Sequence, residues 1–448
     1  MKRLFILIFI LLNISNLHSQ PQGQDLIDSL INELPKMKED TNSVNLLSTI
    51  SEKLSSSNPD KGIEYGLQGV ELAKKIDWKK GEAKCYNSLG MDYSLGKYAY
   101  PKALEYYHKA LKINEELGNK SGIISNLGNM GFLYEKQSND PKALEYYHKA
   151  WKFIEELGDK RKTAKVINQI GIIYINQSNY PKALEYFHKA LKINEELGNK
   201  QGVENNLISI GVIYIHQSDY PKALNYFFKA MKINEQEGGN KIGLANNFVN
   251  IGIIYGHQSD YPKALEYYSK ALKIFEEFVV KDGIADVFSS IGNVYISQSD
   301  YPKALKYFHK ALKINEELGR KSSIANNLSY IGNVYNDQSD YPKALEYYFK
   351  SWKINEELGR KDGVAGNLGN IGSLYLNLSK DSVKSTLPEE TELISLKKEI
   401  NLNRAIKYSL QAIEILEEIG ELNFRASNLY NLAEAINKRE IIKILINI

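Results

Sequence analysis

One segment recurs seven times along this chain, at intervals of forty or forty-one residues. Its clearest marker is the run Pro-Lys-Ala-Leu, which begins at Pro101, Pro141, Pro181, Pro221, Pro262, Pro302 and Pro342. A period of this length is typical of a solenoid, in which each unit buries its apolar face only against its neighbours. The repeats therefore predict one continuous array, although 448 residues would otherwise suggest two or three globular domains.

Each unit has the pattern of two helices joined by a tight turn. In the unit 162–200, apolar residues recur at steps of three and four residues, which is the period of an amphipathic helix. Pro181 follows a polar turn and suits the first position of a second helix, where its missing N–H costs nothing. Gly198 follows that helix and suits a left-handed cap. The unit is therefore predicted to be helix, tight turn, helix and short turn.

Small residues recur where the two helices of a unit would meet. The position that we call the glycine slot lies inside each first helix and holds Gly90, Gly131, Gly171, Gly211, Gly252, Gly292, Gly332 and Gly372. A tyrosine follows each of them by three residues. The matching small residues of the second helices are Ala103, Ala143, Ala183, Ala223, Ala264, Ala304 and Ala344. Because glycine inside a helix costs up to about 1 kcal/mol relative to alanine, its recurrence predicts a close approach of the second helix.

The pattern Leu/Ile-Gly-x-x-Tyr, a polar turn and Ala-Leu-x-Tyr-Tyr/Phe-x-Lys-Ala resembles the tetratricopeptide repeat (TPR). The length of about forty residues is similar to the longer repeats of kinesin light chains and polarity-complex scaffolds. The usual proline that closes the second helix is absent, and Glu195-Glu196 continue that helix instead. The resemblance covers residues 43–440. It implies an all-α fold: a right-handed α-α superhelix, a TPR solenoid of about nine helix pairs plus a partial C-terminal unit.

The first nineteen residues have the pattern of an export signal. Lys2 and Arg3 precede an apolar run from Leu4 to Leu12, and Ser19 suits the position before a cleavage site. We therefore predict a signal peptide over 1–19 and an exported protein, periplasmic or secreted. An uncleaved anchor is the alternative. No later stretch has the roughly 20 apolar residues that a membrane span needs, so the mature chain is expected to have no stable span.

The remaining boundaries follow from where the repeat pattern weakens. We expect an N-terminal capping helix within 20–41, the TPR array over 42–379, an insert with a short helix over 380–403, and TPR-like C-terminal helices over 404–448. In this interpretation a last unit starts near Phe424, and its second helix is interrupted at Ile448.

Composition excludes several classes of function. The formal net charge of +3 leaves no concentrated basic patch, so we expect no nucleic-acid partner. The single cysteine, Cys85, cannot form an internal disulfide or a thiolate cluster. Four histidines recur at one slot of the second helices, too far apart to share a metal: His108, His148, His188 and His309. No phosphate-binding loop, zinc-protease motif or nucleophile elbow is present. We therefore expect no metal, no cofactor and no catalytic site.

In this fold the first helices line the concave face, and their varied positions form the predicted groove. Steps of three and four residues assign to it Asn168, Ile172, Ile175, Asn205, Val212, Ile215, Asn246, Ile253, Asn293, Asn326, Asn333 and Asn336. Asparagine can donate and accept hydrogen bonds, and could hold an extended peptide backbone. In the alternative, the aliphatic residues pack between neighbouring first helices and the asparagines are solvated. No Lys/Arg pair for a terminal-carboxylate clamp is evident, which argues against that mode of peptide binding.

Two function classes remain after these exclusions. The first is a non-catalytic scaffold that binds a protein or peptide partner in the groove. The second is an input module of a bacterial signalling system, because the stretch 28–65 resembles the start of exported repeat regions in sensor kinases and regulators. A membrane-associated signalling partner is implied only in that second interpretation. An enzyme is the least favoured class, because the insert 380–403 contains neither histidine nor cysteine.

Overall fold

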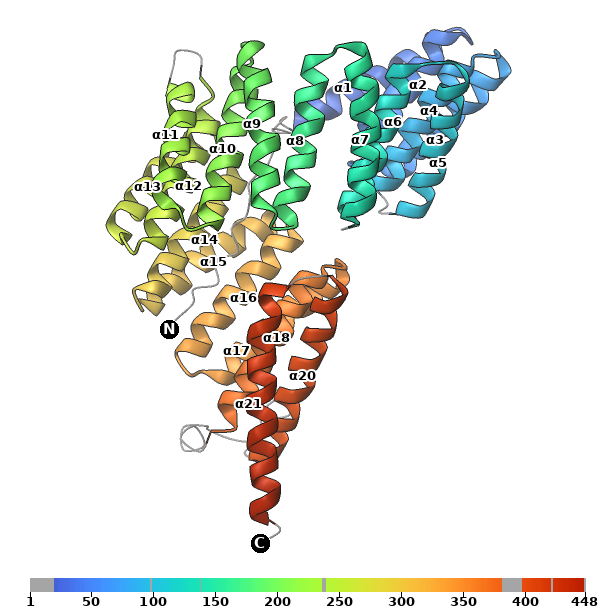
Figure 1. Ribbon diagram of the computed structural model, residues 1–448. Coiled ribbons are helices and arrows are strands. Elements are labelled where there is room, and N and C mark those ends of the chain that lie inside the picture. Colours follow the sequence, from blue (N-terminus) through green and yellow to red (C-terminus); the bar gives the residue numbers. More distant parts are fainter. Residues whose placement is uncertain are drawn as a thin grey trace. The chain divides into compact units, whose positions relative to one another are not determined.

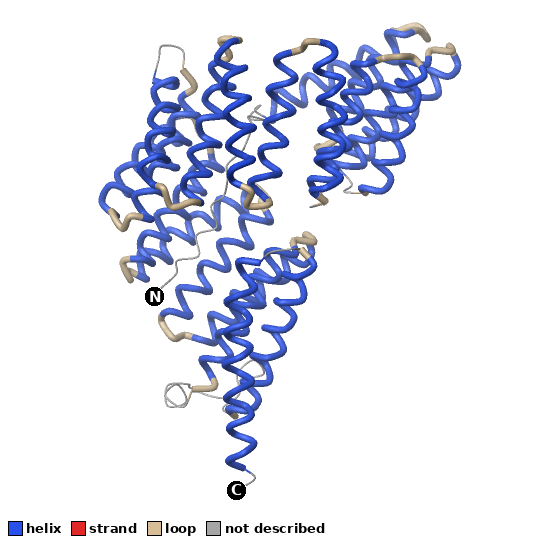
Figure 2. Tube along the Cα trace, viewed as in Figure 1, coloured by secondary structure: helices blue, strands red, loops and turns tan. Residues whose placement is uncertain are grey.

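The computed structural model describes residues 20–96, 99–137, 139–235, 239–380, 397–419 and 422–446, and these form twenty α-helices and no strand (Figures 1 and 2). The predicted signal peptide, 1–19, lies outside the described residues. Contacts divide the chain into two compact units, and the division falls between Ile233 and Asn234. Each unit is a stack of antiparallel helix pairs. The all-α class and the paired repeats predicted from the sequence are therefore confirmed.

The first unit begins with α1 (Gln20–Glu33) and a short 3-10 helix, η1 (Leu34–Lys36). Its helix pairs are α2 (Thr41–Leu54) with α3 (Pro59–Lys75), α4 (Lys79–Met91) with α5 (Tyr100–Glu116), α6 (Lys120–Lys136) with α7 (Asp140–Leu157), α8 (Lys160–Asn176) with α9 (Tyr180–Glu196), and α10 (Lys200–His216) with α11 (Tyr220–Glu235). A π-helical turn, η2 (Asp92–Gly96), follows α4. The last two residues of α11 belong to the second unit.

The second unit continues the same order. Its pairs are α12 (Lys241–His257) with α13 (Tyr261–Glu277), α14 (Lys281–Ser297) with α15 (Tyr301–Glu317), α16 (Lys321–Asp337) with α17 (Tyr341–Glu357), and α18 (Lys361–Leu378) with α20 (Lys398–Glu418). The last helix is α21 (Leu422–Ile446). Most of the expected insert, 381–396, lies outside the described residues, whereas residues 398–403 already belong to α20.

The last helix differs from the expectation for the C-terminal residues. The sequence suggested a first helix from Phe424 and the start of a second, but α21 is one continuous helix of 25 residues. The stretch after Asn437 contains Lys, Arg, Glu, Ile and Leu, without the proline or glycine that would end a helix. Nothing in the local sequence therefore interrupts α21.

The glycine slot has the role that the sequence predicted. A Cβ added at Gly90 would lie 2.4 Å from the ring of Tyr107, and one at Gly292 would lie 2.7 Å from the ring of Phe308. These aromatic side chains come from the second helix of the same pair and are at most 2% exposed. The glycine slots of the seven first helices from α4 to α16 thus each accept an aromatic ring of the partner helix, whereas Gly372 of α18 faces Ser409.

The tyrosine three residues after the glycine slot forms a stacked pair with the second helix. Tyr174 of α8 stacks on Tyr186 of α9, with ring centroids 5.5 Å apart. Lys182 lies 5.0 Å from the Tyr174 ring, and Lys189 lies 5.4 Å from the Tyr186 ring. Both outer faces of the tyrosine pair are therefore covered by lysines. Such a column contributes packing and cation–π attraction at the surface of the pair.

Turn residues end and start the helices as their chemistry requires. Gly198 adopts φ 61° at the end of α9, which confirms the predicted left-handed cap. Pro181 lies in the first turn of α9, and the Asn179 side chain accepts a hydrogen bond from the backbone N–H of Lys182. The equivalent caps of later second helices are Asp219, Asp260, Asp300 and Asp340.

Two turns between repeats lack the glycine that their position favours. Asp77 has φ 51° and Val279 has φ 55°, where five other repeats have glycines, such as Gly319 at φ 66°. A β-branched residue is strained in this region, at a cost of about 1–2 kcal/mol. We therefore expect Val279→Gly to raise the free energy of unfolding by about 1 kcal/mol, because the side chain is 71% exposed and little packing is lost. Urea denaturation measures this gain, and a lower midpoint would contradict it.

Candidate functional site

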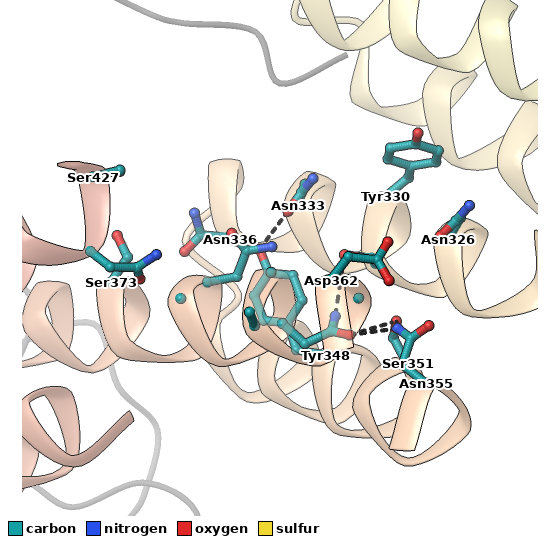
Figure 3. Close-up of a pocket in the computed structure, with 18 of the residues that line it drawn as sticks. Asn326, Tyr330, Asn333, Asn336, Tyr348, Ser351, Asn355, Asp362, Ser373 and Ser427 are labelled. Carbon is teal, nitrogen blue, oxygen red and sulfur yellow. Dashed lines mark hydrogen bonds between the residues drawn. The ribbon is translucent and has the colours of Figure 1, made fainter. Parts of the chain in front are cut away.

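The second unit contains a cavity of about 500 Å³ on the side of its first helices. Residues of α14, α16, α18 and α21 line it, with further contributions from α17 and α20 (Figure 3). Asparagine is the most frequent residue of the lining, which includes Asn293, Asn326, Asn333, Asn336, Asn370 and Asn431. The cavity therefore offers many neutral hydrogen-bond donors and acceptors in a small space.

Four of the groove residues predicted from the sequence line this cavity: Asn293, Asn326, Asn333 and Asn336. They come from two neighbouring first helices, Asn293 from α14 and the other three from α16. All four are half-buried. The three- and four-residue steps thus identified residues that the fold brings together here.

Other predicted groove residues lie elsewhere. Asn246 and Ile253 of α12 are half-buried in the same unit, but they do not line the cavity. The six from the first unit belong to α8 and α10: Asn168, Ile172, Ile175, Asn205, Val212 and Ile215. They are described with the first unit and do not extend the cavity.

Three of the predicted aliphatic groove residues are parts of the core. Ile175, Val212 and Ile215 are only 6%, 3% and 4% exposed. Ile175 packs in a cluster with buried residues of α9 and α10, and the half-buried Ile172 packs against the same cluster. For these residues the alternative of packing within the fold is the one that the structure supports. Their side chains are not available to an extended ligand.

Asn168 and Asn205 already have partners within the fold. The Asn206 side chain donates a hydrogen bond of 2.6 Å from Nδ2 to Oδ1 of Asn168. Oδ1 of Asn205 accepts a hydrogen bond of 3.1 Å from Gln201 Nε2. Asn168 thus belongs to a polar network that joins neighbouring helices.

That network is a repeated chain of asparagine amides, which the sequence reasoning missed. Near the end of α9, Asn194 donates to Asn206 over 2.8 Å, and Asn206 in turn donates to Asn168. Asn355 donates to Asn367 over 2.9 Å in the second unit. A signal was present in the sequence, since an asparagine recurs thirteen residues after Pro101, Pro181, Pro221, Pro302 and Pro342. Buried amides need such partners.

Part of the cavity floor is held by hydrogen bonds between its own residues. The Tyr348 hydroxyl donates to Oδ1 of Asn333 over 2.8 Å, and the Ser351 hydroxyl reaches Oδ1 of Asn367 at 3.2 Å (Figure 3). Burial raises the pKa of Tyr348 well above its usual range, so its hydroxyl keeps its proton and remains a donor. Asn333 is therefore oriented before any ligand arrives.

Tyr330, Asn370 and Asn431 are further cavity residues that the sequence analysis did not assign. Each lies four residues after a predicted groove position or its equivalent, which places it on the same helix face. Burial raises the pKa of the Tyr330 phenol, although the neighbouring Asn293 side chain opposes that shift. These residues widen the polar surface between α14 and α21.

The charged residues of the cavity lining are Asp337, Arg360 and Asp362, and Arg360 lies 2.9 Å from Asp362. Outside the lining, Arg320 lies 3.4 Å from Asp286. Burial raises the pKa of Asp286 to about 6, although the neighbouring Arg320 guanidinium opposes that shift. The described residues include no group of three or more His, Cys, Asp or Glu side chains that could hold a metal ion.

The one thiol of the chain is inert by position. Cys85 is fully buried in α4, and burial raises its pKa to about 12. A thiol in this state is not a nucleophile at neutral pH.

Stacked antiparallel helix pairs, with a cavity on the side of the first helices, define a helical repeat protein. The tetratricopeptide repeat model matches residues 122–196, 162–236, 202–277 and 283–357, and a second model of the same repeat matches 83–117. These matches cover more than half of the sequence. The chain belongs to the tetratricopeptide repeat family.

Comparison with curated protein sequences finds no match. Among solved structures, the fold is similar to that of the apo quorum sensor NprR from B. thuringiensis, at 12% identity and a TM-score of 0.53, over 75% of this chain and 99% of that one. Aspartyl phosphate phosphatase F from Bacillus subtilis has 16% identity and a TM-score of 0.53, over 76% and 96%. Apo RapI has 18% identity and a TM-score of 0.51, over 62% and 99%. At these identities the likeness concerns the fold.

Proposed function

We propose that this protein is a non-catalytic interaction scaffold that binds an extended peptide or protein segment in the cavity of its second unit. The observation that carries the proposal is the gathering of side-chain amides from α14, α16, α18 and α21 around one cavity of about 500 Å³. An extended peptide exposes one N–H and one C=O per residue, and asparagine can pair with both. This cavity would accommodate only part of such a ligand, a few residues long.

The arrangement of the cavity favours recognition of backbone over one particular side chain. Asn333 is fixed by Tyr348, and Asn367 is fixed by Ser351 and Asn355, so two of the amides are ordered in advance. Preordered groups lose little conformational freedom on binding, which favours affinity. Most polar residues of the lining carry amides or hydroxyls, which suit hydrogen bonding to a peptide, so binding is the function that we propose.

We also propose that the protein acts after export, in the periplasm or outside the cell, because residues 1–19 have the pattern of a signal peptide. None of the described helices is long and apolar enough to cross a bilayer. An input module for signalling would use the same first step, capture of a ligand in the cavity. NprR, which shares the fold, is a quorum sensor. A membrane-associated partner would then read the bound state.

A substitution at Gly366 tests whether the cavity is the binding site. Gly366 lies on the cavity surface of α18, and a Cβ added there would meet no atom within 4 Å. Leucine favours a helix more than glycine does, by close to 1 kcal/mol, so Gly366→Leu should fold at least as well while filling the cavity. Peptides are first selected from a random displayed library on the unmodified chain. We expect them to bind Gly366→Leu about tenfold or more weakly than the unmodified chain, because a few hydrogen bonds are lost.

The matched control is Gly128→Leu in α6. Gly128 also lies inside a first helix, and a Cβ there also meets nothing within 4 Å, but it belongs to the first unit and is outside the cavity. Binding measured by fluorescence anisotropy should be unchanged in this variant. Equal affinity of both variants and the unmodified chain would show that peptides bind elsewhere.

A further inference from the structure

An arginine in the second unit holds a carboxylate that the chain itself supplies. Arg320 lies just before α16, and its Nη1 contacts Oδ1 of Asp286 on α14 at 3.4 Å. The same nitrogen reaches the backbone oxygen of Asp282 at 3.5 Å. Both side chains of the ion pair are 24% exposed. In this helix pair, therefore, an arginine that precedes a first helix contacts a carboxylate on the previous first helix.

The next helix pair has an arginine at the same position but lacks that carboxylate. Arg360 stands forty residues after Arg320, just before α18, whereas the residue forty after Asp286 is Asn326. Nη1 of Arg360 is buried and has no hydrogen-bond partner among the described residues, and Arg360 lines the cavity together with Asn326. Its Nη2 does pair with Asp362 at 2.9 Å, but the Asp362 side chain is 54% exposed, so that pair is weak.

Both arginines stand where two earlier repeats have an asparagine. Asn119 and Asn199 donate from Nδ2 to Oδ1 of Asn114 and Asn194, over 2.7 and 2.8 Å. Neither arginine replaces that hydrogen bond, because Oδ1 of Asn315 and Oδ1 of Asn355 have no partner among the described residues. Asn355 is 2% exposed and lines the cavity beside Arg360. Arg360 therefore does not serve the structural hydrogen bond that its position provides in those two repeats.

We propose that Arg360 binds a carboxylate of the peptide ligand, in the place that the Asp286 side chain takes beside Arg320. The inference rests on the proposed function, because it names the chemistry of that ligand. A guanidinium contacts a carboxylate through parallel N–H donors, and such charge-assisted bonds are short and strong. The groove positions that follow from the helical period hold no Lys/Arg pair that could form a carboxylate clamp. Arg360 precedes the helix and lies outside those positions.

The first experiment compares peptides selected by two proteins. A random library displayed with a free C-terminus is selected on the unmodified chain and on Arg360→Gln. We expect the unmodified chain to enrich an acidic residue at one position, or a free terminal carboxylate, and Arg360→Gln to lose that preference. The enriched peptide should bind Arg360→Gln about tenfold or more weakly, as expected for one hydrogen bond to a charged group. Peptides carrying Gln for Glu, Asn for Asp, or a C-terminal amide identify which carboxylate is bound.

A second variant keeps Arg360 and supplies the missing carboxylate. Asn326→Asp should recreate the Arg320–Asp286 arrangement in the next helix pair. The acidic peptide should therefore bind Asn326→Asp about tenfold more weakly than it binds Asn326→Gln. Asn326→Gln also loses the asparagine side chain, but it adds no charge. Arg320→Gln is the control outside the cavity and should leave peptide binding unchanged. Circular dichroism of each variant checks that the helices are intact.

The outcomes separate the two proposals. Enrichment of peptides without an acidic or terminal-carboxylate preference would overturn the role of Arg360 and leave the binding scaffold in place. Weaker binding to Asn326→Gln than to Asn326→Asp would also overturn it. If neither protein enriches any peptide, the proposed function fails and this inference fails with it.

Discussion

Gly292→Ala is expected to lower the free energy of unfolding by about 1–3 kcal/mol, the usual cost of overpacking a core. The added Cβ would lie 2.7 Å from the ring of Phe308, which is fully buried and cannot move into solvent. Alanine is the better helix former by close to 1 kcal/mol, so helix propensity alone predicts the opposite sign. Urea denaturation followed by circular dichroism measures the change, and hydrogen exchange in α14 and α15 shows whether the loss is local.

Alanine substitutions at two other glycines serve as comparisons for Gly292→Ala. A Cβ at Gly128 meets nothing within 4 Å, so Gly128→Ala should raise the stability by up to about 1 kcal/mol. At Gly171 the nearest atom of the Phe187 ring would be 3.0 Å away, so Gly171→Ala should cost less than Gly292→Ala. A stabilising effect at Gly292 would mean that the glycine slot does not set the helix spacing.

The pairing of helices could be predicted because it depends on residues that recur. The residues equivalent to Gly171, Pro181 and Ala183 recur in seven repeats, and the period shows which positions face each other. The continuous α21 could not be predicted by extending the repeat. Its residues favour a helix throughout, and local propensity gave a longer helix than the repeat pattern predicted.

The candidate site could be predicted only in part. Helical periodicity placed Asn333 and Asn336 on the correct face, and both line the cavity. The same steps assigned Ile175 and Ile215 to the groove, yet both are buried. Periodicity gives the direction of a side chain around its own helix, but it does not give the distance to the next helix. That distance determines whether the position is open or packed.

The roles of the asparagine side chains could not be predicted from residue type. Asn206 and Asn205 are neighbours in α10, but Asn206 is fully buried in the amide network whereas Asn205 is half-buried. An asparagine can be solvated, bind a ligand or pair with another amide, because it both donates and accepts. Residue type therefore could not distinguish these roles, and the arrangement of three consecutive helices was needed.

Asp92 departs from the repeat in a way that alignment of the units makes visible. It stands two residues after the glycine slot of α4, where the other units carry buried aliphatic residues: Leu133, Ile173, Ile213, Ile254, Val294, Val334 and Leu374. Asp92 is fully buried as well. Its Oδ2 accepts a hydrogen bond of 2.7 Å from the Ser51 hydroxyl, and its Oδ1 has no partner among the described residues. The opposite residue is Gly62, where a Cβ would lie 2.5 Å from Oδ1.

We expect this carboxyl to make the stability of the first unit decrease as the pH rises from about 4 to about 7. Burial raises the pKa of Asp92 to about 7, although the Ser51 hydrogen bond favours the carboxylate; Glu52 adds a smaller increase. In the unfolded chain the group loses its proton near pH 4. Between these values the folded state binds more protons, so unfolding becomes easier by at most about 1.4 kcal/mol per pH unit. Above about pH 7 this contribution no longer changes.

Asp92→Asn removes the ionisation while keeping the shape of the side chain. Unfolding by urea at pH 5 and pH 8 compares the two proteins. At pH 5, about one unit above the unfolded-state pKa, the variant should be more stable by about 1.4 kcal/mol. At pH 8 the variant should be more stable by a few kcal/mol, up to about 4 for a pKa difference of three units. Ser51→Ala removes the hydrogen bond that favours the carboxylate, so the decrease of stability should extend to higher pH. If Asp92→Asn were equally destabilising at both pH values, the charged carboxylate would be a required acceptor in the native core, and the expected sign would be wrong.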